Sequence, residues 1–322
     1  MGNPSLPLIS IVIPCFNEEP GLAALFSSLE QAFAAREDYA YEVIVVDDGS
    51  SDGTLAWLRQ KREQVDYLQV LSLSRNFGSH AAVQAGFRVA RGDAVTILGA
   101  DLQDPPELIT RLADSWREGN PMVWALRKTR RDPLLKRLVS WFAHRLFAWL
   151  TALEIPAEGV ELFLADRRVV DAVTAARWRN CSILMAFFWA GFPSSTVHYE
   201  KVSRSQGRSK WTLRGKVRLF VDMTVGFSSR PMRLISGLGL LCALGGFAYA
   251  TLIVGRWATG KGAPIEGWSS LMVVTLIMGG LILVSLGVLG EYLYRNLEES
   301  RERPTYIVGE HLPARRDPNP SA

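Results

Sequence analysis

Hydrophobic residues follow one pattern up to Arg127, where short apolar runs alternate with helix-length segments. The runs that predict strands are Ile9–Ile13, Glu42–Val46, Leu68–Leu73, Ala94–Leu98 and Met122–Leu126. The segments that predict helices are Glu19–Arg36, Thr54–Gln64, Ser79–Ala90 and Pro106–Glu118. Because the strands are almost uniformly apolar, we expect a mostly parallel, Rossmann-like α/β sheet with helices on both faces.

A different pattern follows in the C-terminal part. Leu234–Val254 and Trp268–Gly290 contain no charged residue, and crossing the roughly 30 Å hydrocarbon core of a bilayer takes about 20 residues. Both segments are rich in glycine, which lets membrane helices approach closely. They predict two transmembrane helices; the alternative is a pair of buried helices in a globular core.

Basic residues flank these two segments. They are Arg230 and Arg233 before the first, Arg256 and Lys261 between the two, and Arg295, Arg301 and Arg303 after the second. This distribution favours both long flanks on the cytoplasmic side, and Met1–Pro7 lacks the features of a signal peptide. We therefore expect a multi-pass protein of the inner (cell) membrane with a cytoplasmic catalytic domain.

Cys15, Cys181 and Cys242 lack disulfide or metal-ligand spacing, as a reducing compartment predicts.

Two amphipathic segments complete the organisation. A Trp-rich helix is predicted near 133–153 and a basic one over Lys210–Phe227; both suit the lipid interface, although packing on the catalytic domain stays an alternative. The expected parts are a catalytic domain over 1–209, a juxtamembrane segment over 210–232, two membrane helices over 233–294 and a cytoplasmic tail over 295–322. The tail after Pro313 is rich in proline, and we expect it to be disordered.

Polar clusters follow three of the predicted strands, at the edge of the sheet where ligands bind. Asn17 and Glu18 follow the first strand and can bind a ligand or cap the next helix. Asp47 and Asp48 follow the second, and because adjacent carboxylates repel each other, a donor-rich ligand such as a nucleoside is the better explanation for the pair. Asp101, after the fourth strand, and Gln103 offer oxygens suited to a divalent cation that also binds substrate phosphates.

Two common nucleotide-binding signatures are missing from the sequence. No G-x-G-x-x-G follows the first strand, and no G-x-x-x-x-G-K-[ST] occurs. A dinucleotide enzyme and a P-loop enzyme are therefore both disfavoured.

The chain resembles the inverting family 2 glycosyltransferases of GT-A fold, and among them the polyprenyl-phosphate glycosyltransferases. The resemblance extends from Ile9 to Val308 and rests on several motifs. These are IVIPCFNEE, VVDDGSSDGT, LSRNFG, GADLQDPPE, RSQGRSKW, and the paired apolar segments followed by GEYLYR and RPTYIV.

The resemblance implies a role for each part of these motifs. Nucleoside contacts are implied for Pro14, Asn17, Glu18 and Asp48, with Asp47 beside them. Asp101 and Gln103 would hold Mg²⁺ or Mn²⁺ on the donor diphosphate. Arg75 would lie near the donor, and Arg204 with Lys210 would close over its phosphates. The lipid phosphate would be bound by Arg127, Arg137 and Ser140. The catalytic group would comprise Asp101, Asp104, Glu161 and Arg127.

The implied reaction transfers one sugar from a nucleotide sugar, with a UDP-sugar favoured, to undecaprenyl phosphate or a similar lipid for cell-envelope glycan modification. A phosphate monoester has a second pKa of about 6 and is mostly dianionic at neutral pH. We therefore hypothesise that no single carboxylate serves as an indispensable base. The partners implied are the lipid, the membrane and a downstream flippase, without nucleic acid; a homo-oligomer stays open.

Two positions depart from the family pattern. Gly99 stands where many relatives have the first Asp of Asp-Ala-Asp, which indicates a changed metal shell. Val160–Leu164 corresponds to Gly-Asp-Phe-Arg-Leu, so Glu161 can replace the acid but Phe163 cannot supply the charge of the Arg. These departures indicate unusual acceptor or sugar specificity.

Two other functions remain as alternatives. A processive polysaccharide synthase usually carries Gln-x-x-Arg-Trp, where this chain has Thr174-Ala175-Ala176-Arg177-Trp178. A catalytically inert membrane scaffold or sugar sensor is the other, suggested by Phe163.

Overall fold

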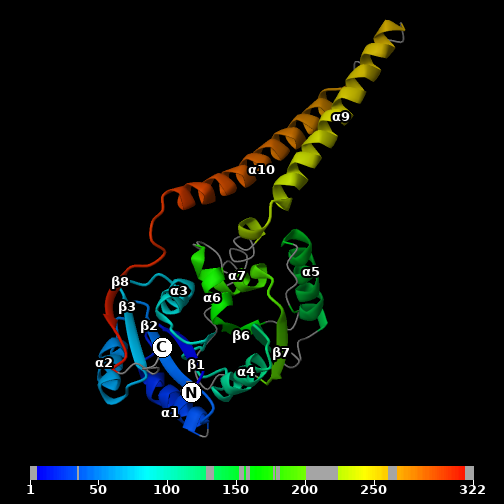
Figure 1. Ribbon diagram of the computed structural model, residues 1–322. Helices are drawn as coiled ribbons and strands as arrows, with labels where there is room; N and C mark the ends of the chain where they lie inside the picture. Colours follow the sequence, from blue (N-terminus) through cyan, green and yellow to red (C-terminus); the bar gives the residue numbers. More distant parts are fainter. Residues whose placement is uncertain are drawn as a thin grey trace. The chain divides into compact units, whose positions relative to one another are not determined.

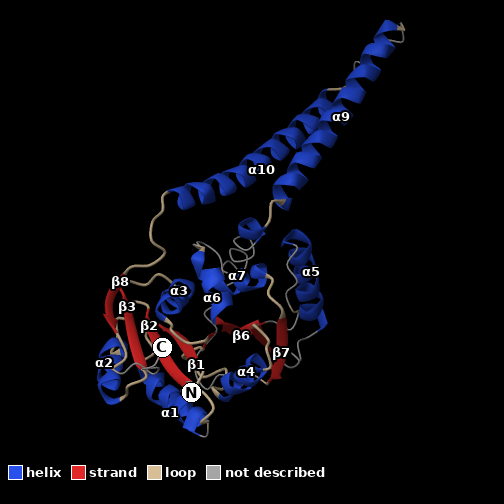
Figure 2. Ribbon diagram, in the orientation of Figure 1, coloured by secondary structure: helices blue, strands red, loops and turns tan. Residues whose placement is uncertain are grey.

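The computed structural model describes residues 6–34, 36–127, 134–151, 156, 160–176, 178, 182–200, 224–259 and 267–315 (Figure 1). These residues contain an eight-stranded sheet in the order β7-β5-β6-β4-β1-β2-β3-β8 (Figure 2). The strands are β1 Leu8–Cys15, β2 Ala40–Asp47, β3 Leu68–Leu73, β4 Ala94–Ile97, β5 Met122–Arg127, β6 Val160–Asp166, β7 Ser194–Tyr199 and β8 Val308–Leu312. The helices are α1 Glu19–Ala34, α2 Thr54–Gln64, α3 Ser79–Val89, α4 Glu107–Arg117, α5 Leu134–Thr151, α6 Arg167–Ala175, α7 Ile183–Ala190, α9 Arg230–Ala258 and α10 Trp268–Ser300.

The sheet is mostly parallel, which confirms the predicted α/β fold. Strand β1 pairs in parallel with β2 and β4, β2 with β3, and β5 with β7. Strand β6 runs antiparallel between β4 and β5, and β8 runs antiparallel to β3. The carboxyl ends of β1 to β5 and of β7 therefore lie along one edge of the sheet, where such folds bind ligands.

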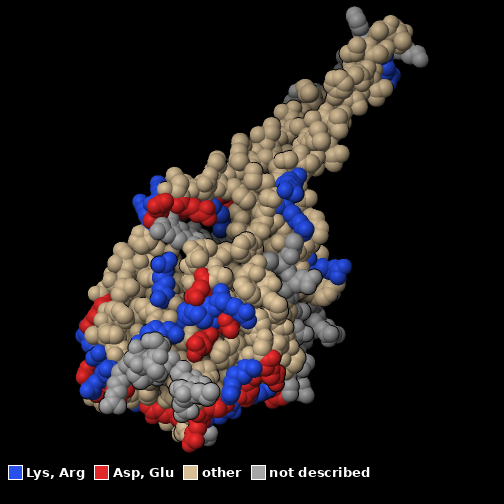
Figure 3. All heavy atoms as spheres, viewed as in Figure 1, with Lys and Arg blue, Asp and Glu red and all other residues tan. Residues whose placement is uncertain are grey.

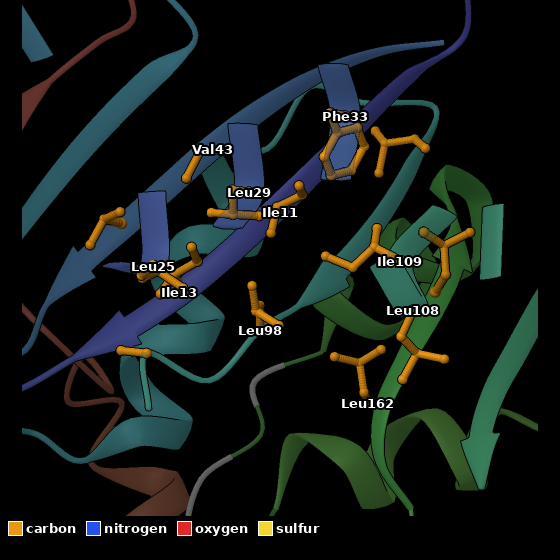
Figure 4. Packing of buried hydrophobic residues seen from close by; sticks show 14 of the residues in the cluster. Ile11, Ile13, Leu25, Leu29, Phe33, Val43, Leu98, Leu108, Ile109 and Leu162 are labelled. Carbon is orange, nitrogen blue, oxygen red and sulfur yellow. The ribbon is translucent and has the colours of Figure 1, made fainter. Parts of the chain in front are cut away.

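Two hydrophobic clusters cover the two faces of the sheet. One contains Ile11, Ile13 and Val43 of the strands, packed against residues of α1, α2 and α4 (Figure 4). The other contains Val12 and Phe163 with residues of α3, α6 and α7. Neighbouring strand residues point to opposite faces, which explains why the strands are apolar along their whole length.

The C-terminal segment corrects the predicted domain boundaries. Residues 295–322 were expected to form a tail, but β8 pairs with β3, with Leu312 opposite Val70 and Val308 opposite Leu73. Residues from Pro304 onward belong to the same compact unit as the sheet. A strand of five residues that follows a long apolar helix has too little pattern of its own to be recognised from sequence.

The second compact unit comprises 146–152 and 217–303, and it contains α9 and α10. The two predicted apolar segments lie within these helices, and both helices are long and apolar enough to cross a membrane. Their large hydrophobic side chains are exposed: Leu241, Phe247 and Leu283 are 68%, 73% and 71% exposed. Figure 3 shows that charged side chains are scarce along the long helices between their ends. Within this unit, the hydroxyl group of Tyr292 donates to the Ser228 carbonyl at 2.6 Å.

Packing of α3 on the sheet gives a first prediction. A Cβ at Gly86 would lie 2.3 Å from Val12 Cγ1, so we expect Gly86→Ala to destabilise the protein by about 1–3 kcal/mol. At Gly21 in α1 the nearest atom to a Cβ is 3.8 Å away. Gly21→Ala is the matched control and should be neutral or stabilising by about 0.5–1 kcal/mol. Thermal unfolding of both purified variants, followed by tryptophan fluorescence, tests this; equal melting temperatures would contradict it.

Candidate functional site

The loops at the carboxyl edge of the sheet form one hydrogen-bonded group. Asn17 follows β1 with a φ of 55°, a left-handed conformation that asparagine tolerates better than most residues. Its Oδ1 accepts from Ser51 N at 2.9 Å, and its N–H donates to Ser50 Oγ at 2.9 Å. The Glu18 N–H donates to Thr54 Oγ1 at 3.0 Å. Bonds of this kind fix the loop after β1 against the loop after β2.

Asp47 and Asp48 are both buried at the end of β2, with 1% and 3% of their surface exposed. Asp47 accepts from Ser50 N at 3.2 Å and from Ser72 Oγ at 3.0 Å. Asp48 accepts from Phe77 N at 2.7 Å and from Gly78 N at 2.8 Å. The protein itself thus supplies donors to both carboxylates, so the pair does not need the donor-rich ligand that was the better explanation from the sequence. Nucleoside contact by Asp48 stays a prediction.

Burial raises the pKa of Asp48, and the amides of Phe77 and Gly78 act in the opposite direction. These amides stabilise the ionised carboxylate of Asp48. The carboxylate in turn holds the loop after β3 in place.

Arg75 lies in that loop and is exposed to solvent. A Cβ at Gly49 would lie 2.5 Å from the carbonyl carbon of Arg75, and Gly49 has a φ of 70°. Only glycine fits there, because both the backbone conformation and the close approach exclude a side chain. The Arg75 guanidinium lies over the Phe77 ring, 4.2 Å from its centroid.

The loop after β4 carries the predicted metal ligands. Asp101 is exposed, and its carboxylate accepts from both the backbone and the side-chain amide of Gln103. Leu102, between them, has a φ of 54°, a strained conformation that brings the two polar side chains together. A Cβ at Gly99 would lie 3.2 Å from Asp101 Oδ1, so glycine leaves this carboxylate room.

Asp104 has a partner that the sequence did not indicate. It is buried, and its Oδ1 accepts from the Tyr199 hydroxyl at 2.6 Å. Burial and then the hydrogen bond to Asp104 raise the pKa of Tyr199, so the phenol stays a donor at neutral pH. Arg127, at the end of β5, is close enough to Tyr199 to lower that pKa. Tyr199 ends β7, whose polar sequence Ser-Ser-Thr-Val-His-Tyr gave no signal of a strand.

The structure does not describe the other predicted site residues far enough to place their side chains. Arg204 and Lys210 lie outside the described residues. The backbones of Arg137 and Ser140 belong to α5, and that of Glu161 belongs to β6, beside the end of β5. Their side chains lie outside what is described.

Phe163 occupies a core position. It is fully buried, and its ring lies 4.5 Å from that of Phe187, 5.7 Å from that of Trp124 and 6.3 Å from that of Phe87. Because β6 alternates between the two faces of the sheet, residue 163 points into the cluster under α3 and α7. A buried aromatic side chain therefore occupies the position at which the family pattern has an Arg.

Cys15 is also buried, and its thiol donates to the Val46 carbonyl at 3.6 Å. Burial raises the pKa of this thiol, and a buried protonated thiol is a poor nucleophile. The residue is structural.

Comparison with protein families matches the model described as "Glycosyl transferase family 2" to residues 10–185. An uncharacterized glycosyltransferase of Synechocystis is 37% identical over 94% of this chain and 95% of its own length. The undecaprenyl-phosphate 4-deoxy-4-formamido-L-arabinose transferase of Aeromonas hydrophila is 32% identical over 96% and 95% of the two chains. The bactoprenol glucosyl transferase of Shigella phage SfV is 33% identical over 93% and 97%.

The bond between Tyr199 and Asp104 gives a second prediction. We expect Tyr199→Phe to cost about 1–3 kcal/mol of stability, because a buried carboxylate loses its donor. Tyr67→Phe is the matched control: its hydroxyl donates to Glu30 Oε1 at the same 2.6 Å, but Glu30 also pairs with Lys61 and its side chain is 44% exposed. The melting temperature should therefore fall further for Tyr199→Phe than for Tyr67→Phe. A shift for Tyr199→Phe no larger than the control's would show that Asp104 does not need this donor.

Proposed function

The chain belongs to glycosyl transferase family 2, and on that premise we propose that it transfers one sugar from a nucleotide-sugar donor to a polyprenyl phosphate at the cytoplasmic face of the cell membrane. The observation that carries the proposal is the extent of the match to the bactoprenol glucosyl transferase. At 93% of this chain, the match includes the two long apolar helices as well as the sheet. Undecaprenyl phosphate is the acceptor we propose.

The donor belongs at the loops after β1, β2 and β3. Asn17, Glu18 and the Asp47–Asp48 pair lie there, on a framework that internal hydrogen bonds hold in place. We propose that these residues bind the nucleoside, with Pro14 beside them, and that Arg75 contacts the donor. A UDP-sugar is the donor class that we favour.

A divalent cation fits the loop after β4. Among the described residues no group of three or more His, Cys, Asp or Glu side chains could hold a metal on its own. Mg²⁺ needs only one or two carboxylates when substrate phosphates complete its shell, and exposed Asp101 beside Gln103 meets that need. We propose that these residues hold Mg²⁺ or Mn²⁺, which would neutralise charge on the departing nucleoside diphosphate. Arg204 and Lys210 would add positive charge to the same phosphates.

The acceptor belongs beside Arg127, at the end of β5. We propose that Arg127, Arg137 and Ser140 bind the lipid phosphate. Because this phosphate is already mostly dianionic at neutral pH, positioning and electrostatic stabilisation are sufficient and no indispensable base is required. Asp104, tied to Tyr199, and Glu161 would then shape the charge around the reacting groups.

The connectivity of the chain supports the proposed membrane topology. Strands β1 to β7 precede α9 and β8 follows α10, yet all eight strands belong to one sheet. Both ends of the two-helix segment must therefore lie on the same side of the membrane, as two complete crossings require. Basic residues at both ends make that side the cytoplasmic one.

Incubation of purified protein with labelled UDP- and GDP-sugars, Mg²⁺ and undecaprenyl phosphate tests the function. We expect an organic-soluble lipid-linked monosaccharide. A polymeric product would instead support the processive synthase, and no product with any UDP- or GDP-sugar would support the inert scaffold.

Asp101 gives the third prediction. We expect Asp101→Asn to lower kcat by at least about 100-fold, because the charge on the leaving group would lose its cation. Asp171→Asn is the control: Asp171 pairs with Arg167 one helical turn away on the surface of α6, and this variant should keep wild-type activity. Steady-state assays at saturating donor measure both. Full activity of Asp101→Asn would contradict the proposed metal site.

A further inference from the structure

The residues that directly follow α10 contact the loop that carries Arg75. Residues 301–306 separate the end of α10 from Ile307, whose carbonyl accepts from the Ser74 N–H at 2.9 Å. Val308 then pairs with Leu73. The backbone next to Arg75 is thus fixed by a segment that lies more than 230 positions further along the chain.

A β-bulge adjusts this contact. The register between β3 and β8 shifts between Ser72 and Leu73, so that Glu310 lies opposite Ser72 and Val308 opposite Leu73. Gly309 is the extra residue, and a Cβ there would lie 3.5 Å from the Ser72 carbonyl oxygen and 3.6 Å from Ser74. Bulges of this kind bend a strand and redirect its end. With this extra residue, the carbonyl of Ile307 lies within hydrogen-bond distance of the Ser74 N–H.

Tyr306 anchors the segment on the same face of the sheet. It packs against the hydrophobic cluster that includes Leu73, Ala82 and Phe87, and Phe77 packs against that cluster as well. Ala82 and Phe87 belong to α3, so the cluster that Tyr306 joins includes this helix, and burial raises the pKa of the phenol. We call Tyr306–Gly309 the C-terminal clamp.

The far end of β8 is held by different contacts. Glu310 pairs with Arg59 of α2, and Arg62 donates to the Pro313 carbonyl at 2.8 and 3.0 Å. Leu312 packs against the opposite hydrophobic cluster. The docking of β8 and its contact with the Arg75 loop can therefore be perturbed separately.

The Arg75 loop depends on these backbone contacts from three sides. Asp48 binds the N–H groups of Phe77 and Gly78, Gly49 lies directly against the backbone of Arg75, and Ile307 binds Ser74. The first two supports come from the residues directly after β2, within the proposed donor site itself. The third comes from the end of the chain.

We propose that the C-terminal clamp is a positioning element for the donor site: by fixing Ser74 and the packing around Phe77, it holds Arg75 where it contacts the donor's diphosphate. Tyr306 and Ile307 are its positioning residues. The role rests on the proposed function, because it assigns Arg75 to the donor. It adds that donor affinity depends on the residues that directly follow the second apolar helix.

Isothermal titration of UDP and of GDP, each with Mn²⁺, into full-length detergent-solubilised protein tests the clamp without any acceptor. We expect Tyr306→Ala to leave the loop in its binding arrangement about a tenth of the time, which raises the Kd about tenfold. Tyr306→Phe keeps the ring and should restore wild-type affinity. Leu312→Ala perturbs the far end of the same strand and should change the Kd less than about twofold.

A double-mutant cycle separates positioning from general destabilisation. In an Arg75→Ala background, Tyr306→Ala should have almost no further effect on the Kd, because its effect passes through Arg75. Additive losses, or an unchanged Kd in Tyr306→Ala while the wild type binds, would overturn the clamp and leave the proposed function intact. A wild-type protein that binds neither nucleotide would overturn both.

Discussion

The loops at the carboxyl edge of the sheet depend on the hydrogen bonds that the Asp47 and Asp48 carboxylates accept. Both are buried: Asp47 binds Ser50 in the loop after β2 and Ser72 of β3, and Asp48 binds Phe77 and Gly78 in the loop after β3. Because a buried carboxylate without donors is costly, charge and loop structure stabilise each other. Bonds from Asn17 to the loop after β2 join a further loop to the group. A ligand at this edge would therefore meet a framework that is ordered before it binds.

This framework also explains how far the sequence could predict the structure. Strands β1 to β5 were found because each is a buried, mostly apolar run, and their carboxyl ends share one edge because the five strands point in the same direction. Strands β6, β7 and β8 were not found. Strand β6 runs antiparallel between β4 and β5, β7 alternates polar residues at one edge of the sheet, and β8 follows the long apolar helices. In all three, pairing with distant residues decides the structure, and local pattern does not encode that pairing.

The candidate site shows the same division. Residues in motifs that directly follow a predicted strand, such as Asn17, Asp48 and Asp101, were found at the expected edge. Tyr199 was missed because its strand was missed, and the reason for the Asp47–Asp48 pair was wrong because hydrogen bonds to the backbone leave no trace in sequence. Phe163 was singled out from the sequence as a departure from the family pattern, but only its packing among Phe87, Trp124 and Phe187 reveals what the ring does.

The position of β8 at the end of the chain has a consequence for biosynthesis. Its partner β3 is complete at Leu73, and translation at about 5–20 residues per second takes roughly 10–50 s to reach Val308 from there. During that interval both apolar helices emerge from the ribosome while the edge of β3 remains open. An open edge strand is prone to pairing with other chains, so a ribosome that stalls late would release a protein with both long apolar helices and an unprotected sheet edge.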